Sequence, residues 1–512
     1  MPRRCELGPL LWLVTGAAGL FLLLGTLLIP RAGLDADEAL FTNPLYRSLG
    51  ADFELGVLHH KIPVMLIAYI GAFKTALCWP ILRLFGPSIY AVRLPMVLAG
   101  AATILLFFFL AETLAGRIAA ACAALLLATD PTFLLTETFD WGPVALEHLL
   151  LVSGCLAMIS RRPALASLLF GLALWNKATF AWSLTGLIAA TLMAYWPQAR
   201  EFLRDRRLLL RCGLAFIIGA LPLLLFNLHR RAATLHASQG ISLTQDAAAK
   251  LHQLRAALDG SGLFGYLTSG ASPRSSIFVY AFALAILAIP LWWRSAARRA
   301  GIFALVFCAV TFFCMFITRG AGTGIHHTVL LWPMPQLLVG VALSALRPRS
   351  IPAVVVALLA ASNLLVIDRY FVELDRAGAT GNFTDAVSTL ANNLSSLPNS
   401  PVYVADWGIY EALVYLQQGR VPLHYSPLLL VAEHPSPAQR RSISAMIADP
   451  KAIFVTHIAS REMFPGVRAR LEAIARSGGY TRRIVETIPD SKGHPVYELW
   501  RFSAPRRATF IP

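Results

Sequence analysis

The chain has 512 residues, of which 57% are hydrophobic and only 14% are charged, and its mean hydropathy is +0.62. A water-soluble protein of this length needs far more polar surface, so the composition excludes an ordinary soluble enzyme. The formal net charge of +16 comes largely from Arg clusters between apolar segments, which indicates membrane topology and no nucleic-acid partner.

Eleven apolar segments have lengths close to the roughly 20 residues that a helix needs to cross a bilayer. We expect helices because lipid cannot hydrogen-bond an exposed backbone. The predicted fold class is a polytopic α-helical membrane protein of about eleven transmembrane helices, with interfacial helices in the first outer loop and a small C-terminal soluble α/β domain. The predicted spans are 9–30, 87–110, 117–135, 141–160, 163–178, 179–196, 208–228, 276–293, 301–318, 327–346 and 350–367.

A further apolar segment, 62–84, carries Lys74 near its middle and Arg83 close to its end. Arg3 and Arg4 predict a cytoplasmic N-terminus. If 62–84 does not cross the bilayer, almost every short Arg-rich loop also falls on the cytoplasmic side. The positive-inside rule therefore favours an interfacial or re-entrant position for this segment.

The composition changes near residue 368, where apolar runs shorten to strand length, as in "VYVADWGI" (402–409) and "AIFVTHIA" (452–459). We predict a transmembrane catalytic domain over 1–367 and a periplasmic α/β domain over 368–512.

Three carboxylates crowd the stretch "LDADEALF" directly after the first span: Asp35, Asp37 and Glu38. Asp35 or Asp37 can cap a short helix, and adjacent carboxylates can also supply a general base or bind a divalent cation. Asp140, in "TETFDWGP", falls on the same predicted outer face, where it can cap a helix or act on the substrate. Asp37 and Asp140 are thus candidates to converge on one hydroxyl or one metal ion.

Cationic side chains fall on this face as well. Lys177 lies at a helix end, where it either reaches to the interface or contacts a phosphate. His326 and His327 open the tenth span. They can be polar helix-end residues, or they can donate hydrogen bonds to phosphate oxygens, orient an acid or bind a metal ion. His60 and Lys61 precede segment 62–84 and offer similar chemistry.

Arg93 lies within an apolar span and is expected to pair with an acid or a bound anion. Together the residue types suit group transfer from a lipid phosphate, because carboxylates activate a hydroxyl and cations stabilise a departing phosphate. A transporter is the non-enzyme alternative, although the sequence shows no duplicated halves.

The order of these motifs resembles the GT-C superfamily of integral-membrane glycosyltransferases, in particular the protein O-mannosyltransferases and the bacterial aminoarabinose transferase for lipid A. The resemblance covers roughly residues 10–345. It rests on the "DE" pair Asp37–Glu38, on Asp140, and on three longer strings: "LFGPSIYAVRLP" (84–95), "GLALWNKATF" (171–180) and "HHTVLLWPMPQLL" (326–338).

The resemblance implies an inverting transfer from a polyprenyl-phosphate-linked sugar at the outer face of a bacterial inner membrane, to a glycolipid, glycan or protein acceptor. It implies Asp37 as catalytic base, Glu38 and Asp140 as supporting acids or metal neighbours, and Lys177 as a donor-phosphate contact. Relatives carry a "KP" or "HPP" signature near His60 and Lys61, where this chain reads "HHKIP". An oligosaccharide ligase or polymerase is the second enzyme reading.

Overall fold

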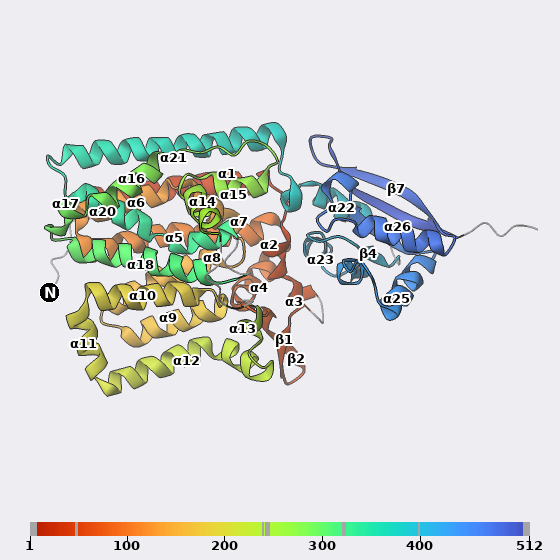
Figure 1. Ribbon diagram of the computed structural model, residues 1–512, viewed down its shortest axis with the longest axis horizontal. Coiled ribbons are helices and arrows are strands. Elements are labelled where there is room, and N and C mark those ends of the chain that lie inside the picture. Colours follow the sequence, from red (N-terminus) through yellow and green to blue (C-terminus); the bar gives the residue numbers. More distant parts are fainter. Residues whose placement is uncertain are drawn as a thin grey trace, which may run out of the picture.

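The computed structural model describes residues 8–46, 50–237, 240, 246–319, 324–397 and 400–504. Its helices run side by side in a bundle, and a sheet-bearing C-terminal part lies at one end of that bundle (Figure 1). Arg3 and Arg4, on which the predicted orientation of the N-terminus depends, lie outside the described residues.

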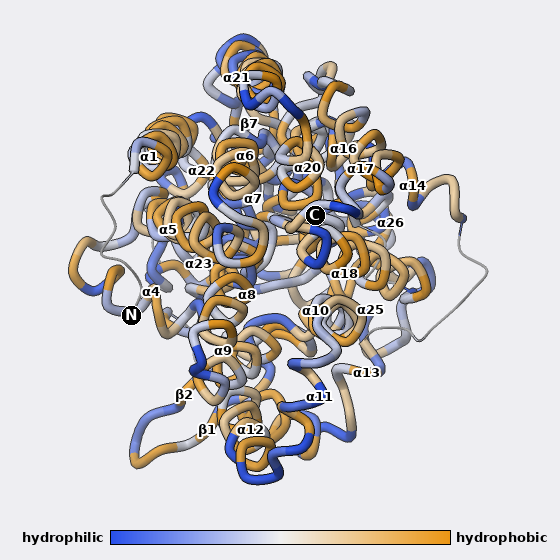
Figure 2. Tube along the Cα trace, turned by 90° about the vertical axis from the view of Figure 1, so that its left-hand side faces the viewer, coloured by the Kyte–Doolittle hydropathy of each residue, from blue (hydrophilic) through white to orange (hydrophobic). Residues whose placement is uncertain are grey.

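Five of the described helices are long and apolar enough to cross a membrane. They are α1 (Pro9–Leu28, extended by η1, Ile29–Arg31), α5 (Ile89–Ala115), α12 (Arg206–His229), α18 (Arg298–Ile317) and α21 (Ser350–Ala377). Hydrophobic residues predominate along these helices (Figure 2). The chain is therefore a multi-pass membrane protein.

Two further spans are broken. The pair α6 (Arg117–Ala128) and α7 (Pro131–Phe139) bends by 58°, and α19 (Ile325–Thr328) with η2 (Val329–Leu331) meets α20 (Met334–Ser344) at 44°. The first break has a local cause, because a residue before proline avoids helical geometry and Asp130 caps the new helix through the N–H of Phe133 at 2.8 Å.

Four shorter apolar helices occupy the remaining predicted positions. Because they are too short to count as spans, the described residues hold five full-length candidates, or up to seven if each bent pair is one span. The shorter ones are α8 (Val144–Ile159), α9 (Pro163–Asn176), α10 (Phe180–Ala194) and α16 (Ile277–Leu287). The other helices before residue 350 are α2 (Ala36–Leu40), α3 (Asn43–Tyr46), α4 (Phe73–Phe85), α11 (Trp196–Arg204), α13 (Ala233–Ala237), α14 (Ala247–Leu258), α15 (Ser261–Leu267) and α17 (Ile289–Trp293).

Segment 62–84 differs from the interfacial helix that we expected. Its first part belongs to a three-stranded antiparallel sheet of β1 (Phe53–Val57), β2 (His60–Ile67) and β3 (Ile70–Gly71), and only its second part is helical, as α4. Pro63 disfavours a helix interior, while β1 satisfies the backbone of β2. At about 1.5 Å per residue, α4 is too short to cross the bilayer.

The C-terminal part is a five-stranded sheet of order β5-β4-β6-β8-β7, in which β4 is parallel to β5 and β6, and β8 is antiparallel to β6 and β7. The strands are β4 (Val402–Val404), β5 (Leu423–Tyr425), β6 (Ile453–His457), β7 (Thr481–Pro489) and β8 (Pro495–Ser503). The helices around it are η3 (Gly381–Phe383), α22 (Ala386–Ser395), α23 (Tyr410–Gln417), α24 (Pro427–Leu430), α25 (Pro437–Ala448), η4 (Ala459–Arg461) and α26 (Val467–Ser477).

This sheet packs over the acidic stretch that follows α1. Leu34 and Ala39 share a buried core with Leu413 and Tyr497 of the C-terminal part. The hydroxyl of Tyr415 accepts from the N–H of Ser88 at 2.8 Å and donates to its carbonyl at 2.9 Å, which ties α23 to the start of α5. The acidic stretch therefore lies between the bundle and the sheet.

Candidate active site

Asp35 begins the short helix α2 through a capping box. Its carboxylate accepts from the N–H of Asp37 at 2.9 Å, and Glu38 accepts in return from the N–H of Asp35 at 3.1 Å. Burial and the neighbouring carboxylates raise the pKa of Asp35 well above its usual value. Asp35 thus shapes the backbone that carries the other two acids.

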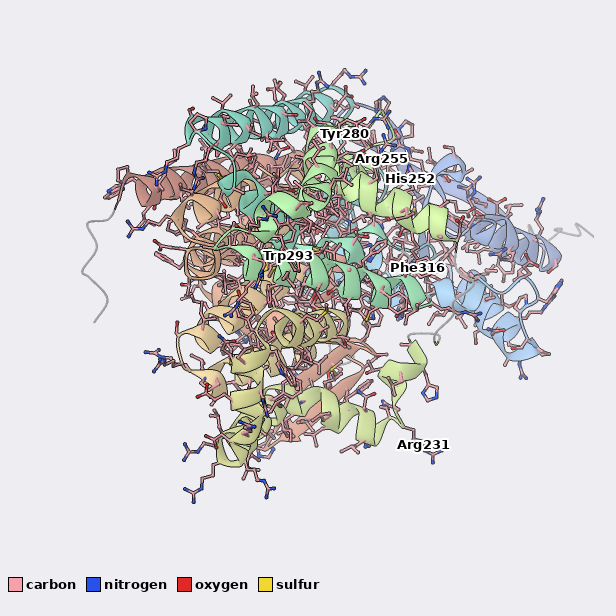
Figure 3. All side chains as sticks on the ribbon, turned by 60° about the vertical axis from the view of Figure 1, so that its left-hand side comes forward. Arg231, His252, Arg255, Tyr280, Trp293 and Phe316 are labelled. Atoms are coloured by element: carbon pink, nitrogen blue, oxygen red, sulfur yellow. The ribbon has the colours of Figure 1, made fainter. Side chains whose placement is uncertain are left out.

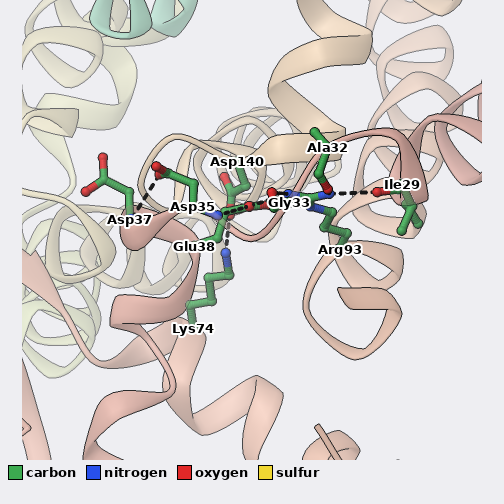
Figure 4. Close-up of polar contacts among 9 residues, drawn as sticks. All are labelled: Ile29, Ala32, Gly33, Asp35, Asp37, Glu38, Lys74, Arg93 and Asp140. Carbon is green, nitrogen blue, oxygen red and sulfur yellow. Dashed lines mark hydrogen bonds and ion pairs between the residues drawn. The ribbon is translucent and has the colours of Figure 1, made fainter. Parts of the chain in front are cut away.

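Arg93 of α5 clamps this stretch in place (Figure 4). Its Nε and Nη2 atoms donate to the two carboxylate oxygens of Glu38 at 2.7 and 2.6 Å. Its remaining donors reach the carbonyls of Ile29, Ala32 and Gly33 at 2.6–2.8 Å. All five guanidinium N–H groups are engaged.

The expectation that Arg93 pairs with an acid agrees with this geometry. Because no N–H is left over, Arg93 does not offer a donor to a lipid phosphate, and its predicted phosphate role is corrected to a positioning one. Glu38 is likewise occupied on both oxygens.

Asp140 is held by Lys74, which stands out in the sequence only as a charge near the middle of the apolar segment 62–84. The Nζ atom of Lys74 lies 2.5 Å from Oδ2 of Asp140, and both side chains are buried (Figure 4). Oδ1 accepts from the N–H of Ala145 at 3.0 Å. Burial alone would lower the pKa of Lys74, but Asp140, Cys78 and Glu38 together outweigh burial and the pKa is raised.

Asp37 differs from its three neighbours. Within the described part of the chain its carboxylate makes no hydrogen bond and no ion pair, and the residue is partly exposed. Burial is the largest influence on the pKa of Asp37 and raises it. Lys177 and Lys74 lower this pKa and Glu38 raises it, and the net shift is upward from 3.8.

Lys177 is brought beside the acids by β3, since it forms an antiparallel bridge with Ile70. Its side chain is only 2% exposed but makes no hydrogen bond among the described residues. A Cβ added at Gly142 would lie 3.1 Å from its Nζ atom, and Gly142 has a φ of +73°, so a glycine is required there.

Glu147, in the first turn of α8, was not singled out from the sequence. Both of its carboxylate oxygens are buried without a hydrogen-bond partner in the described structure, and its electrostatic partners are Lys177 and Asp140. An acid inside an apolar segment was the signal that could have identified it.

His326 and His327 lie in α19, at the start of the second bent pair of helices. Their ring centroids are 4.1 Å apart, and Lys177 acts electrostatically on both imidazoles. The Nδ1 atom of His327 is buried without a partner in the described residues. A free ammonium and an unpartnered imidazole nitrogen are suited to binding an anion.

Glu137 is fully buried three residues before Asp140. One of its oxygens lies 2.7 Å from Nδ1 of His148, whose Nε2 lies 2.9 Å from the carbonyl of Val329. These contacts join α7, α8 and η2, and so fix the segments that carry Asp140 and the histidine pair.

His60 and Lys61 do not join this cluster. They lie at the exposed tip of the β1–β2 hairpin, where Lys61 approaches Glu54 at 3.9 Å. Strand β2 separates them from Ile70 and Lys177 by about 20 Å, at about 3.3 Å per residue. Their predicted role at the donor phosphate is corrected accordingly.

A metal ion between Asp37 and Asp140 does not fit the residues present, because Lys74 already pairs with Asp140. Among the described residues, no group of three or more His, Cys, Asp or Glu side chains could hold a metal.

Comparisons with known proteins agree with this architecture. A family model described as dolichyl-phosphate-mannose-protein mannosyltransferase matches residues 73–226, and a search of curated proteins finds no match. The crystal structure of ArnT from Cupriavidus metallidurans in the apo state has a TM-score of 0.61 at 15% identity, covering 95% of this chain and 97% of that one. The chain has the GT-C fold.

Two further structures are similar to it. ArnT from Cupriavidus metallidurans bound to undecaprenyl phosphate has a TM-score of 0.59 at 14% identity, with 96% of this chain and 98% of that chain covered. The Archaeoglobus fulgidus oligosaccharyltransferase in complex with Zn and sulfate reaches 0.46 at 14% identity, over 94% of this chain and 72% of that one. The match to ArnT spans both the bundle and the C-terminal sheet of this chain.

Proposed function

We propose that this protein is a glycosyltransferase that moves a sugar from a polyprenyl-phosphate donor to a hydroxyl acceptor, with inversion at the anomeric carbon. One observation carries the proposal. Of the four carboxylates in the acidic cluster, only Asp37 has no hydrogen bond or ion pair in the described structure, whereas Asp35, Glu38 and Asp140 are occupied. Glu147 also lacks a hydrogen-bond partner among the described residues, but both of its oxygens are buried, whereas Asp37 is partly exposed. Asp37 is thus the carboxylate available to accept a proton.

In the proposed reaction, the acceptor oxygen attacks the anomeric carbon and Asp37 takes the proton of that hydroxyl. The bond between the anomeric carbon and the phosphate oxygen breaks, and the lipid phosphate leaves with the bonding electrons. Lys177 lies within electrostatic reach of Asp37 and of both histidines, so its ammonium offsets the negative charge that develops on the phosphate.

Glu38 and Asp140 support this chemistry indirectly. Glu38 holds α2 against Arg93, and Asp140 keeps the ammonium of Lys74 close to the acidic stretch. His326 and His327 lie beside Lys177 and offer imidazole N–H groups as hydrogen-bond donors to the lipid phosphate.

The polyprenyl carrier is proposed on two grounds. The matching family is named for a dolichyl-phosphate sugar, and the ArnT structure of the same fold binds undecaprenyl phosphate. For a bacterial chain we infer undecaprenyl phosphate in the inner membrane, with a cytoplasmic N-terminus and a periplasmic domain over 368–512. That domain covers the acidic stretch, so we place the acceptor site between it and the bundle.

The direct test is transfer by the purified protein in liposomes that contain radiolabelled undecaprenyl-phosphate sugars. The sugar and the acceptor for this assay are identified first, by mass spectrometry of glycolipids and glycoproteins from a strain in which the gene is deleted. We expect one class of envelope molecule to lose a single sugar in that strain. Loss of a whole oligosaccharide would instead indicate a ligase or polymerase, and an unchanged envelope with altered uptake would indicate a transporter.

A further inference from the structure

The β1–β2 hairpin has two unlike faces. Cross-strand partners share a face, so the register Leu55↔Ile62 and Val57↔His60 places three apolar side chains together with His60, and Gly56↔Lys61 falls on the opposite face. The ion pair of Lys61 with Glu54 lies on that second face. The hairpin is therefore amphipathic.

Its apolar face has no cover among the described residues. Leu55, Val57 and Ile62 are 38–48% exposed, while the root of the same hairpin, at Val64 and Met65, is buried. Leu58, at the turn, is 94% exposed. A water-exposed hairpin of this composition would be an aggregation hazard.

The turn itself is unusual. Leu58 has a φ of +56°, a backbone conformation that turns normally fill with Gly, Asn or Asp. An apolar side chain held in this strained position at the most exposed point of the hairpin indicates that the side chain meets an apolar surface.

The hairpin is continuous with the lipid-facing side of the bundle. Its root packs against Leu223 and Phe226 near the end of α12, and the Phe53 and Phe226 rings lie 5.9 Å apart. Helix α12 is a membrane-span candidate with only 22% of its apolar window buried, and its exposed side carries Leu214, Ile218, Leu221 and Leu228.

The direction of the hairpin also indicates that it lies next to lipid. It lies at the end of the bundle nearest the C-terminal sheet, and it projects sideways beyond the helices beside α9 and α12, with an apolar tip (Figures 1 and 2). Arg231, just past α12, also points away from the protein (Figure 3). Because the hairpin is attached near the end of α12, we expect the membrane surface around α12 to lie next to the hairpin.

We propose that the β1–β2 hairpin is a membrane-surface arm that inserts its apolar face into the leaflet on the side of the C-terminal sheet. Leu55, Val57, Leu58 and Ile62 enter the boundary between headgroups and acyl chains, and Lys61 with Arg231 faces lipid phosphates. The occupant is the phospholipid surface itself, and the arm is independent of the proposed reaction.

The test compares adjacent positions on opposite faces. Full-length Val57→Cys, Leu58→Cys and Gly56→Cys variants are spin-labelled in nanodiscs of phosphatidylethanolamine and phosphatidylglycerol, and collision with oxygen and with a water-soluble nickel chelate is measured. A label at Lys451→Cys, on the C-terminal part, is the aqueous control, and the labelled parent gives the background from native cysteines.

We expect the oxygen-to-nickel collision ratio to be several-fold higher at positions 57 and 58 than at 56 and 451. Equal ratios at 56, 57 and 58 would overturn the proposal, as would a nickel-dominated ratio at 58. Spin–spin coupling between copies at position 58 would also overturn it and would assign the face to a dimer contact.

Discussion

The ammonium of Lys74 lies 2.5 Å from Oδ2 of Asp140, with both side chains buried, although the two residues are 66 positions apart in the chain. The pair joins α4, the helix after the three-stranded sheet, to the turn between α7 and α8. Lys74 thus occupies Asp140, as Arg93 occupies Glu38. Asp37 has no ion-pair partner among the described residues.

Asp37→Asn is expected to lower kcat for sugar transfer by about 100-fold or more, because the amide cannot accept the acceptor's proton. The measurement is turnover with a labelled polyprenyl-phosphate sugar. Asp35→Asn is the matched control: Asn also caps helices, so activity is expected to stay within a few-fold of the parent and stability within about 0.5 kcal/mol. Full activity in Asp37→Asn would exclude it as the base.

Transfer is expected to fall on the acid side at a pH above 3.8. Burial raises the pKa of Asp37, Lys177 and Lys74 oppose the shift, and the net direction is upward. A base works only when deprotonated, so activity is present above the raised pKa and is lost as the pH falls through it. The check is kcat/KM against pH; an acid limb at or below 3.8 would contradict the assignment.

Lys74→Met is expected to destabilise the fold by about 3–5 kcal/mol, because it leaves the Asp140 carboxylate buried without its partner. The double variant Lys74→Met with Asp140→Leu is expected to recover most of that loss while staying inactive. Thermal unfolding in detergent measures the first effect and the transfer assay the second. An unchanged unfolding temperature in Lys74→Met would show that the ion pair contributes nothing to stability.

Arg93→Lys is expected to destabilise the protein by about 2 kcal/mol or more, since a lysine cannot reach both Glu38 oxygens and three backbone carbonyls. Because Arg93 has no free donor, kcat should fall while KM for the lipid donor stays unchanged. The opposite result, a raised KM at unchanged stability, would assign Arg93 to the donor phosphate.

Lys177→Met is expected to weaken binding of undecaprenyl phosphate by about tenfold, through loss of a charge-assisted contact. Glu147→Gln is the informative partner, because its carboxylate competes for the same ammonium. Removing that charge should strengthen lipid-phosphate binding. Microscale binding measurements in detergent compare the two, and weaker binding by Glu147→Gln would show that the acid itself contacts the ligand.

The sequence by itself determined the class of fold. Apolar segments long enough to cross hydrocarbon leave few alternatives to helices, and these segments recur as apolar helices or bent pairs in the structure. The distribution of Arg clusters also predicted that Asp37, Asp140, Lys177 and the His326–His327 pair share one face, because the positive-inside rule assigns the other face to the basic loops. In the structure Lys177 lies within electrostatic reach of the other members of this set.

Only the tertiary structure decided what each charge does. Asp37 and Glu38 are adjacent and look alike in sequence, but Arg93 reaches Glu38 from 55 residues away and leaves Asp37 free. His60 and Lys61 looked like phosphate ligands, but the strand that carries them turns their end outward. Buried charges are governed by partners distant in the chain, so local pattern cannot rank them, whereas the length and polarity of a membrane span are local properties.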